Sequence, residues 1–155
     1  VQHILVTMGA GAAPPVRGLR PVAAVAPGVA AATGLSLQQL AAALVGQLRP
    51  TAVVCVDSLC SAEGQRLGRT VQFSDSGLYP AQTDHTRHLT RDTLGVPVVA
   101  AGIPTLMQAQ EGADLVVTPR ALDSVIAHGA ALLAGSVNRA LQPRLTVQQL
   151  CWLTG

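Results

Sequence analysis

The stretch Ser36–Asp57, SLQQLAAALVGQLRPTAVVCVD, indicates the fold class of this 155-residue chain. Ser36 and Gln39 have the spacing of a capping box, and the leucines that follow recur at helical intervals, so we expect an amphipathic helix that ends before Pro50. The next run, Thr51–Val56, is apolar from Ala52 onward, which is typical of a strand buried on both faces of a parallel sheet. A helix that leads directly into a buried strand predicts α/β architecture.

The same alternation continues on both sides of this stretch. Further strands are predicted at 69–74, 96–101 and 115–117, and further helices at 103–110, 119–141 and 146–153. Pro104 and Pro119 stand in the expected first turns of two of these helices, and Thr118 has the position of an N-cap. We therefore expect a three-layer sandwich with a mostly parallel central sheet, helices on both of its faces, and all of residues 1–155 in a single domain.

Composition narrows the functional classes. The net charge is +2, every basic residue is arginine, and the chain has one Phe, one Tyr and one Trp, so no basic groove or stacking platform for nucleic acid is predicted. No apolar run reaches the roughly 18 residues of a membrane span, and the N-terminus does not read as a signal peptide. We expect a soluble, intracellular protein with no direct nucleic-acid partner and no membrane partner.

Neither the cysteines nor the histidines have the spacing of a metal site. Cys55, Cys60 and Cys151 are odd in number and form no CxxC pair, so we expect three free thiols, no bound metal and no cofactor. His85 and His88 share a polar stretch that arginines interrupt, which favours a solvated loop over a metal site. Walker, GxGxxG and GxSxG motifs are missing from the sequence.

Two aspartates follow predicted strands. Asp57 ends the strand 51–56, and Asp75 follows the strand 69–74. Because ligands bind at the carboxyl ends of parallel strands, both carboxylates are expected on the same rim of the sheet. Two close carboxylates can act on a water as acid and base, since one of the two pKa values rises. The alternative for Asp75, within Asp75–Gly77, is a structural role in a turn.

Several longer sequence motifs resemble those of a known family. RPVAAVAPG (Arg20–Gly28), AVVCVDSL (Ala52–Leu59), QFSDSGLYP (Gln72–Pro80) and TLGVPVVAAGIPT (Thr93–Thr105) occur in this order. LVVTPR (115–120) and AGSVNRAL (134–141) follow them. Together they resemble the core and the C-terminal part of the germination protease family, which degrades small acid-soluble, DNA-protecting proteins when bacterial spores germinate.

The resemblance implies an α/β sandwich similar to that of the hydrogenase-maturation proteases, and an oligomeric endopeptidase that is made from a zymogen and uses two aspartates. Asp57 matches one of these aspartates. The other belongs to an upstream word similar to TPDALGP, which this chain lacks, because residues 1–19 contain no acidic residue. Since the chain also begins at Val1, we expect it to be truncated at the N-terminus, with Asp75 as a possible substitute for the missing aspartate.

Three functions fit these observations. The leading one is an aspartate-dependent endopeptidase of the cytoplasm of the spore core, in which Asp57 activates the water that attacks small acid-soluble spore proteins. It would work as a homo-oligomer and without a cofactor. The second is a catalytically inactive binding or regulatory subunit of the same fold. The third is a metal-dependent peptidase of the hydrogenase-maturation kind, which would recruit Asp57 and His85 as ligands.

Overall fold

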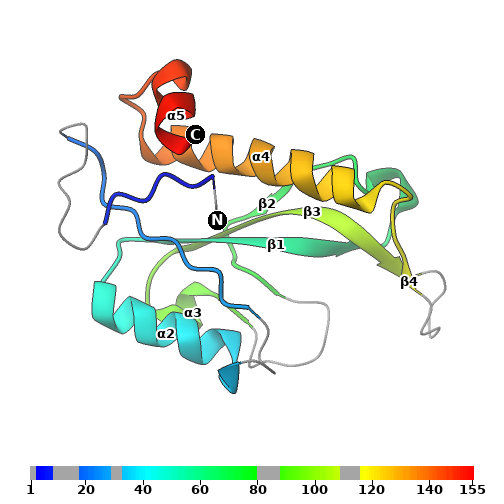
Figure 1. Cartoon of the computed structure of the whole chain (residues 1–155). Coiled ribbons are helices and arrows are strands. Elements are labelled where there is room, and N and C mark those ends of the chain that lie inside the picture. Colours follow the sequence, from blue (N-terminus) through cyan, green and yellow to red (C-terminus); the bar gives the residue numbers. More distant parts are fainter. Residues whose placement is uncertain (1–2, 9–17, 29–32, 80–87, 109–115) are drawn as a thin grey trace. The chain divides into compact units, whose positions relative to one another are not determined.

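The fold of the chain is given by a computed structural model (Figure 1). The structure describes residues 3–8, 18–28, 33–79, 88–108 and 116–155. They divide into two compact units. The sheet unit comprises Pro27–Gly129, and the terminal unit comprises Val1–Ala26 together with Ala130–Gly155. The single domain expected from the sequence stays a prediction, since each unit is described by itself.

The sheet unit is built on a four-stranded sheet with β3 (Val98–Gln108) at its centre. β1 (Val53–Ser61) pairs with β3 in parallel along its whole length. β2 (Gln72–Ser74) and β4 (Val116–Val117) pair with β3 in antiparallel fashion. The α/β class is therefore confirmed, but the described sheet is mixed and not mostly parallel. The three-layer sandwich stays a prediction.

Two helices of the sheet unit begin with capping boxes. At the start of α2 (Leu37–Leu48), the Ser36 hydroxyl accepts a hydrogen bond from the Gln39 N–H, and the Gln39 side chain accepts one from the Ser36 N–H. The short helix α3 (Arg91–Leu94) begins in the same way at Thr90. These caps satisfy backbone N–H groups that have no partner within the helix, which is why the sequence predicts the start of α2 correctly.

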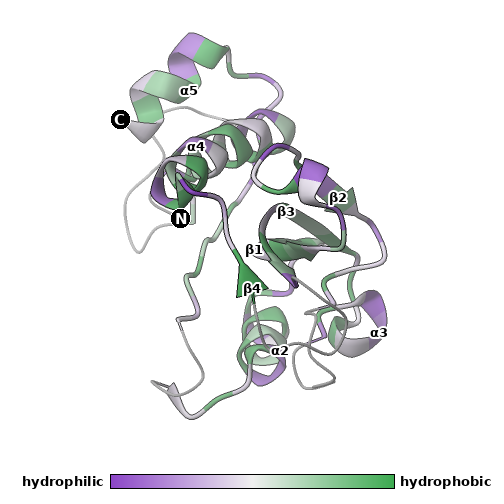
Figure 2. Cartoon of the chain, turned by 90° about the vertical axis from the view of Figure 1, so that its right-hand side faces the viewer, coloured by the Kyte–Doolittle hydropathy of each residue, from purple (hydrophilic) through white to green (hydrophobic). Residues whose placement is uncertain are grey.

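The core of the sheet unit lies on the face of β1 and β3 that α2 and α3 cover, below the strands in Figure 1. Its buried members are Cys55, Leu78, Leu89, Leu94, Val98 and Ala100, and Leu37, Ala41 and Val45 of α2 pack against them. Figure 2 shows the apolar character of the strands. The opposite face meets the first turns of α4 (Leu122–Leu141), because a Cβ on Gly129 would overlap Cδ1 of Ile103.

Both long strands extend further than the sequence predicts. β1 does not end at Val56 but continues through Asp57 to Ser61, and β3 replaces the helix expected at 103–110. Parallel pairing between the two strands overrides the local helix signal. Pro104, which cannot donate to a ladder, is accommodated beside a register shift between Leu59 and Cys60.

Smaller elements complete the described part of the chain. A 3-10 turn, η1 (Gly64–Arg66), follows β1. α4 begins three residues later than Pro119, at which the sequence places its start, and α5 (Val147–Thr154) confirms the helix expected near the C-terminus. In the terminal unit a small core forms from Leu5, Leu145 and Leu150. None of the helices that the structure describes combines the length and the apolar character needed to cross a membrane.

Candidate functional site

Asp57 lies in the middle of β1 and not after its end, so the position expected at the carboxyl end of a strand is wrong. It stands opposite Gly102 of β3, and Gly102 stands opposite Gln72 of β2 on its other edge. Paired residues of neighbouring strands point to the same face of a sheet. Asp57, Gly102 and Gln72 therefore form one row across the sheet, which we call the Asp57 row.

The centre of the Asp57 row accepts only glycine. A Cβ on Gly102 would overlap the backbone carbonyl oxygen of Asp57 and lie 2.7 Å from Cγ of Leu59. The Leu59 side chain thus occupies the space that a side chain at position 102 would need. This close packing fixes the backbone on which the Asp57 carboxylate is carried.

The Asp57 carboxylate is solvent-exposed, and its Oδ1 accepts a hydrogen bond of 2.8 Å from the N–H of Ser58. Its charge acts on Cys55, which lies two residues earlier on the same face of the strand. Burial, and to a smaller extent the charge of Asp57, raise the pKa of the Cys55 thiol from 9.0 to about 11. Cys55 is therefore a neutral thiol near pH 7, which excludes it as a thiolate nucleophile.

A pair of hydroxyl groups lies next to the Asp57 row, and the sequence patterns did not indicate it. The side chains of Ser58 and Thr105 are hydrogen-bonded to each other across β1 and β3, and Thr105 is buried. Ser58 pairs with Ile103, and Thr105 lies at the register shift that follows Pro104, so only the pairing of β1 with β3 reveals the contact. It joins the two strands on the face opposite to the Asp57 carboxylate.

Asp75 is not brought to Asp57. β2 runs antiparallel to β3. The carboxyl end of β2 therefore lies beside the amino-terminal ends of β1 and β3. Ser74 is level with Ala100 and so with Cys55, which places Asp75 one step further from the Asp57 row. Asp75 is thus offset from Asp57 by three residues along the strands, at about 3.3 Å each, and by two strands across the sheet, at about 4.8 Å each. The Cα atoms of Asp57 and Asp75 are therefore roughly 14 Å apart. The expectation that both carboxylates share one rim is wrong.

The surroundings of Asp75 are those of a turn. The Ser74 and Ser76 hydroxyls are 2.7 Å apart, and the Ser76 N–H donates to the Ser74 hydroxyl oxygen at 3.2 Å. Gly77 follows with φ +108, a conformation that L side chains rarely adopt. Such local hydrogen bonds are what Ser and Asp supply in turns, and they match the structural alternative for Asp75.

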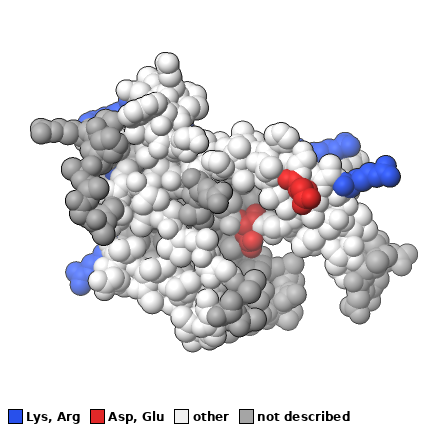
Figure 3. Space-filling view, viewed as in Figure 1, with Lys and Arg blue, Asp and Glu red and all other residues white. Residues whose placement is uncertain are grey.

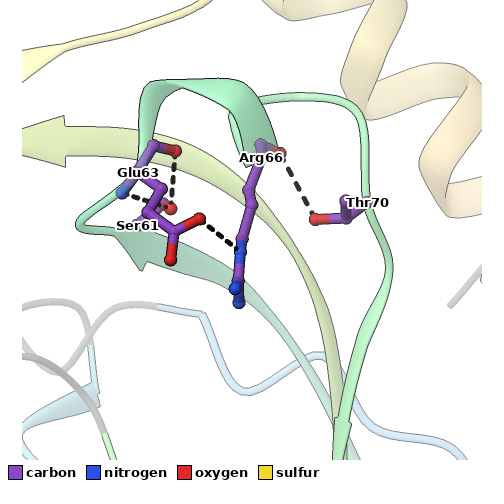
Figure 4. Close-up of polar contacts among 4 residues, drawn as sticks. All are labelled: Ser61, Glu63, Arg66 and Thr70. Carbon is purple, nitrogen blue, oxygen red and sulfur yellow. Dashed lines mark hydrogen bonds and ion pairs between the residues drawn. The ribbon is translucent and has the colours of Figure 1, made fainter.

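A compact loop follows the carboxyl end of β1 (Figure 4). The Ser61 hydroxyl donates to the carbonyl oxygen of Glu63 and accepts from its N–H, at 2.9 and 3.0 Å. Glu63 also forms a salt bridge of 3.0 Å with Nε of Arg66, and the Thr70 hydroxyl donates to the Arg66 carbonyl oxygen. The backbone of this loop is tied to β3 as well, since the N–H of Gly68 donates to the Pro104 carbonyl oxygen at 2.6 Å.

Metal-binding side chains do not gather in the described part of the chain, where no three His, Cys, Asp or Glu residues come together. His85 lies outside the described residues, while the ring of His88 meets that of Tyr79 edge-on, with 5.1 Å between the centroids. All three cysteines are free. Charged side chains are few on the face shown in Figure 3.

Comparisons with known proteins match most of this chain. The model of the germination protease family matches residues 3–113, a range that includes the Asp57 row and the turn at Asp75. The germination protease of Clostridium perfringens (strain SM101) is 28% identical over an alignment of 180 residues, which covers 85% of this chain and 55% of the relative. That of Bacillus licheniformis is 33% identical over 129 residues, with 81% of this chain and 34% of the relative covered.

The germination protease of Halalkalibacterium halodurans is 37% identical over 113 residues, which cover 72% of this chain and 29% of the relative. The chain thus spans about half the length of the clostridial relatives and about a third of the other two. The resemblance read from the sequence words is confirmed. The chain belongs to the germination protease family.

Proposed function

We propose that this chain carries the catalytic core of an endopeptidase of the germination protease kind, with Asp57 as a catalytic residue. The observation that carries the proposal is the family match over 3–113, within which Asp57 lies on a strand that pairs with the central strand β3 along its whole length. An exposed carboxylate on a fixed backbone suits an acid or base, because proton transfer requires a group held at a constant distance from its target.

The chemistry requires a second proton-transferring group. Hydrolysis of a peptide bond needs a base to activate water and an acid to protonate the leaving nitrogen. The carboxyl groups of two aspartates that share a proton are about 3 Å apart, far less than the separation of Asp57 from Asp75. We therefore propose that the partner of Asp57 lies in a segment upstream of this sequence, in a motif similar to TPDALGP, whether of the same copy or of another copy of the protein.

The family membership supports the finer parts of the proposal. The substrate class is small acid-soluble spore proteins, and the site of action is the cytoplasm of the spore core. Assembly as a homo-oligomer and formation from a zymogen belong to the same proposal. No cofactor is required by this chemistry, since both proton transfers are made by carboxyl groups.

A second candidate function is a binding or regulatory subunit that does not cleave. The separation of Asp57 from Asp75 favours it, because strand direction keeps this second carboxylate away from Asp57. In this case the sheet unit would hold a polypeptide without hydrolysing it.

Two versions of the protein separate these candidates. The 155-residue chain and a version extended upstream through the aspartate word are incubated with a purified acid-soluble spore protein, and cleavage is followed by mass spectrometry. We expect sequence-specific cleavage by the extended version and at least a 100-fold lower rate for the 155-residue chain. Absence of cleavage by both, with the substrate still bound, would support the binding subunit instead.

A further inference from the structure

Two buried amide side chains at the end of α4 hold the N-terminal segment of the terminal unit. Asn138 lies in the last turn of α4, and Gln142 follows one turn later, with its N–H donating to the Asn138 carbonyl oxygen at 2.8 Å. The two side chains are 4% and 3% exposed. A buried polar side chain costs free energy unless it is hydrogen-bonded, so the partners of these two amides indicate their role.

Asn138 binds the backbone of the first residues that the structure describes. Its Oδ1 accepts a hydrogen bond of 2.9 Å from the Leu5 N–H, and its Nδ2 donates to the His3 carbonyl oxygen at 2.7 Å. An amide group is suited to this contact, since its oxygen only accepts and its nitrogen only donates. Leu5 is itself buried against Leu145 and Leu150. Residues 3–5 are therefore fixed in position and in direction by a side chain more than 130 residues away in sequence.

Gln142 makes the same kind of contact further along the chain. Its Oε1 accepts a hydrogen bond of 2.9 Å from the Arg20 N–H, and its Nε2 donates to the Arg20 carbonyl oxygen at 2.8 Å. The two amide clamps, Asn138 on residues 3–5 and Gln142 on Arg20, thus have the same chemistry and similar burial. They differ in the segment that they hold, which makes the Gln142 clamp an internal reference for the Asn138 clamp.

α4 contributes residues to both units of the chain. Gly129, in its sheet-unit part, meets Ile103 of β3, and Asn138 belongs to its terminal part. The helix is continuous between Gly129 and Asn138. The anchor for residues 3–5 is therefore carried by the same helix that packs against the central strand of the sheet.

The proposed function gives the Asn138 clamp a consequence for the reaction. If a segment upstream of this sequence supplies the carboxyl partner of Asp57, that segment is joined to the described chain through residues 3–5. Two carboxyl groups share a proton when they are about 3 Å apart, and a displacement of about 1 Å can lower a reaction rate about 100-fold. Each intervening residue adds two rotatable backbone angles, so a clamp on residues 3–5 restricts the upstream segment far more than a clamp on Arg20.

We propose that Asn138 is a positioning residue, which fixes the entry of the upstream segment and thereby the distance between its aspartate and Asp57. The effect on catalysis rests on the proposed function, whereas the anchoring of the segment requires no cleavage. Asn138 acts through the backbone that it holds and does not contact the substrate. Gln142 stabilises the terminal unit without this role.

Both clamps are tested in the version extended upstream through the TPDALGP-like motif. Asn138→Leu removes both hydrogen bonds with little change in side-chain size, and Gln142→Met does the same to the reference clamp. We expect both variants to melt at a lower temperature, because each leaves two backbone groups without their partner. Only Asn138→Leu should lower kcat, by at least tenfold and with KM within twofold, since a misplaced proton-transferring group destabilises the transition state alone. Gln142→Met should keep both constants within twofold at a temperature well below its melting point.

The pH profile separates positioning from a general loss of stability. Coupling between two close carboxyl groups drives their apparent pKa values apart, and it weakens as the groups separate. The bell-shaped profile of kcat should therefore narrow in Asn138→Leu and keep its width in Gln142→Met. Hydrogen exchange gives a readout without substrate, in which amides of the upstream segment should exchange at least tenfold faster in Asn138→Leu only.

Unchanged exchange of the upstream segment in Asn138→Leu would overturn the proposal, as would equal losses of kcat in the two variants at an unchanged profile width. Cleavage by Asn138→Leu at the unmutated rate would refute the positioning role and leave the peptidase standing. Faster exchange in Asn138→Leu, in an extended version that never cleaves, would refute only the peptidase. If Asn138→Leu does not fold, Asn138→Asp is measured in its place, since it keeps the acceptor for the Leu5 N–H and loses only the donor to His3.

Discussion

The Asp57 row and the turn around Asp75 show how two similar sequence patterns acquire different surroundings. In each, an aspartate follows a run that is predicted to be a strand. Asp57 becomes an internal residue of a nine-residue strand that is paired with β3 throughout. Asp75 follows a three-residue strand and lies in a turn with Ser74 and Ser76. Strand length and strand direction, both set by partners distant in sequence, make the difference.

Among the substitutions that test this comparison, Gly102→Ala should lower the stability of the protein most. Its Cβ would overlap the Asp57 carbonyl oxygen and crowd Leu59, so either β1 and β3 separate or both strands shift. We expect the free energy of unfolding to fall by about 3 kcal/mol or more, as for a severely overpacked core. Urea denaturation followed by circular dichroism measures it.

Gly135→Ala serves as the matched control, because no atom would lie within 4 Å of its Cβ and the residue is in the interior of α4. Alanine should leave stability unchanged or raise it by up to about 1 kcal/mol. A cost below about 1 kcal/mol for Gly102→Ala would contradict the close packing described for the Asp57 row.

A smaller loss is expected from Gly77→Ala in the turn after Asp75. The substitution places a side chain at φ +108 and against the Leu89 carbonyl oxygen, the group that accepts the Leu78 N–H at 2.9 Å. We expect a loss of about 2 kcal/mol, since a turn joined to Leu89 through one isolated bridge can relax more readily than the long paired strands. If Gly77→Ala lowered the melting temperature more than Gly102→Ala, the turn would be packed more rigidly than the Asp57 row, which would contradict this expectation.

The smallest expected effect is that of Asp57→Asn on the reactivity of the Cys55 thiol. With a pKa of about 11, this thiol should react with Ellman's reagent at pH 8 far more slowly than the exposed Cys60 and Cys151. Asp57→Asn removes a nearby negative charge, which favours the thiolate and lowers the pKa of Cys55. Because burial is the larger cause, the slow phase should accelerate only severalfold. An unchanged slow phase would show that the charge of Asp57 does not reach Cys55.

Local signals explain which parts of the fold could be predicted. The capping boxes at Ser36 and Thr146 act within four residues, and both predicted helices are present. The helix expected at 103–110 is wrong because the β1–β3 pairing, a contact between segments about 45 residues apart, outweighs Pro104 as a helix-start signal. The same nonlocal pairing extends β1 past Asp57.

The candidate site was predictable only in its residue types. The sequence points to Asp57 and Asp75, but strand direction decides whether two such residues meet, and no local pattern encodes the antiparallel course of β2. The Ser58–Thr105 hydroxyl pair likewise depends on register.

The measurement that tests the account most directly compares Asp57→Asn with Asp75→Asn in the version extended upstream through the aspartate word. Asparagine keeps the shape of the carboxylate but cannot ionise, so loss of a catalytic carboxylate should lower kcat/KM by at least about 100-fold. We expect such a loss for Asp57→Asn with no change in melting temperature, since the side chain is exposed. Asp75→Asn should keep kcat/KM within about twofold, because a turn residue takes no part in proton transfer. Full activity of Asp57→Asn, or loss of activity in a folded Asp75→Asn protein, would contradict the assignment.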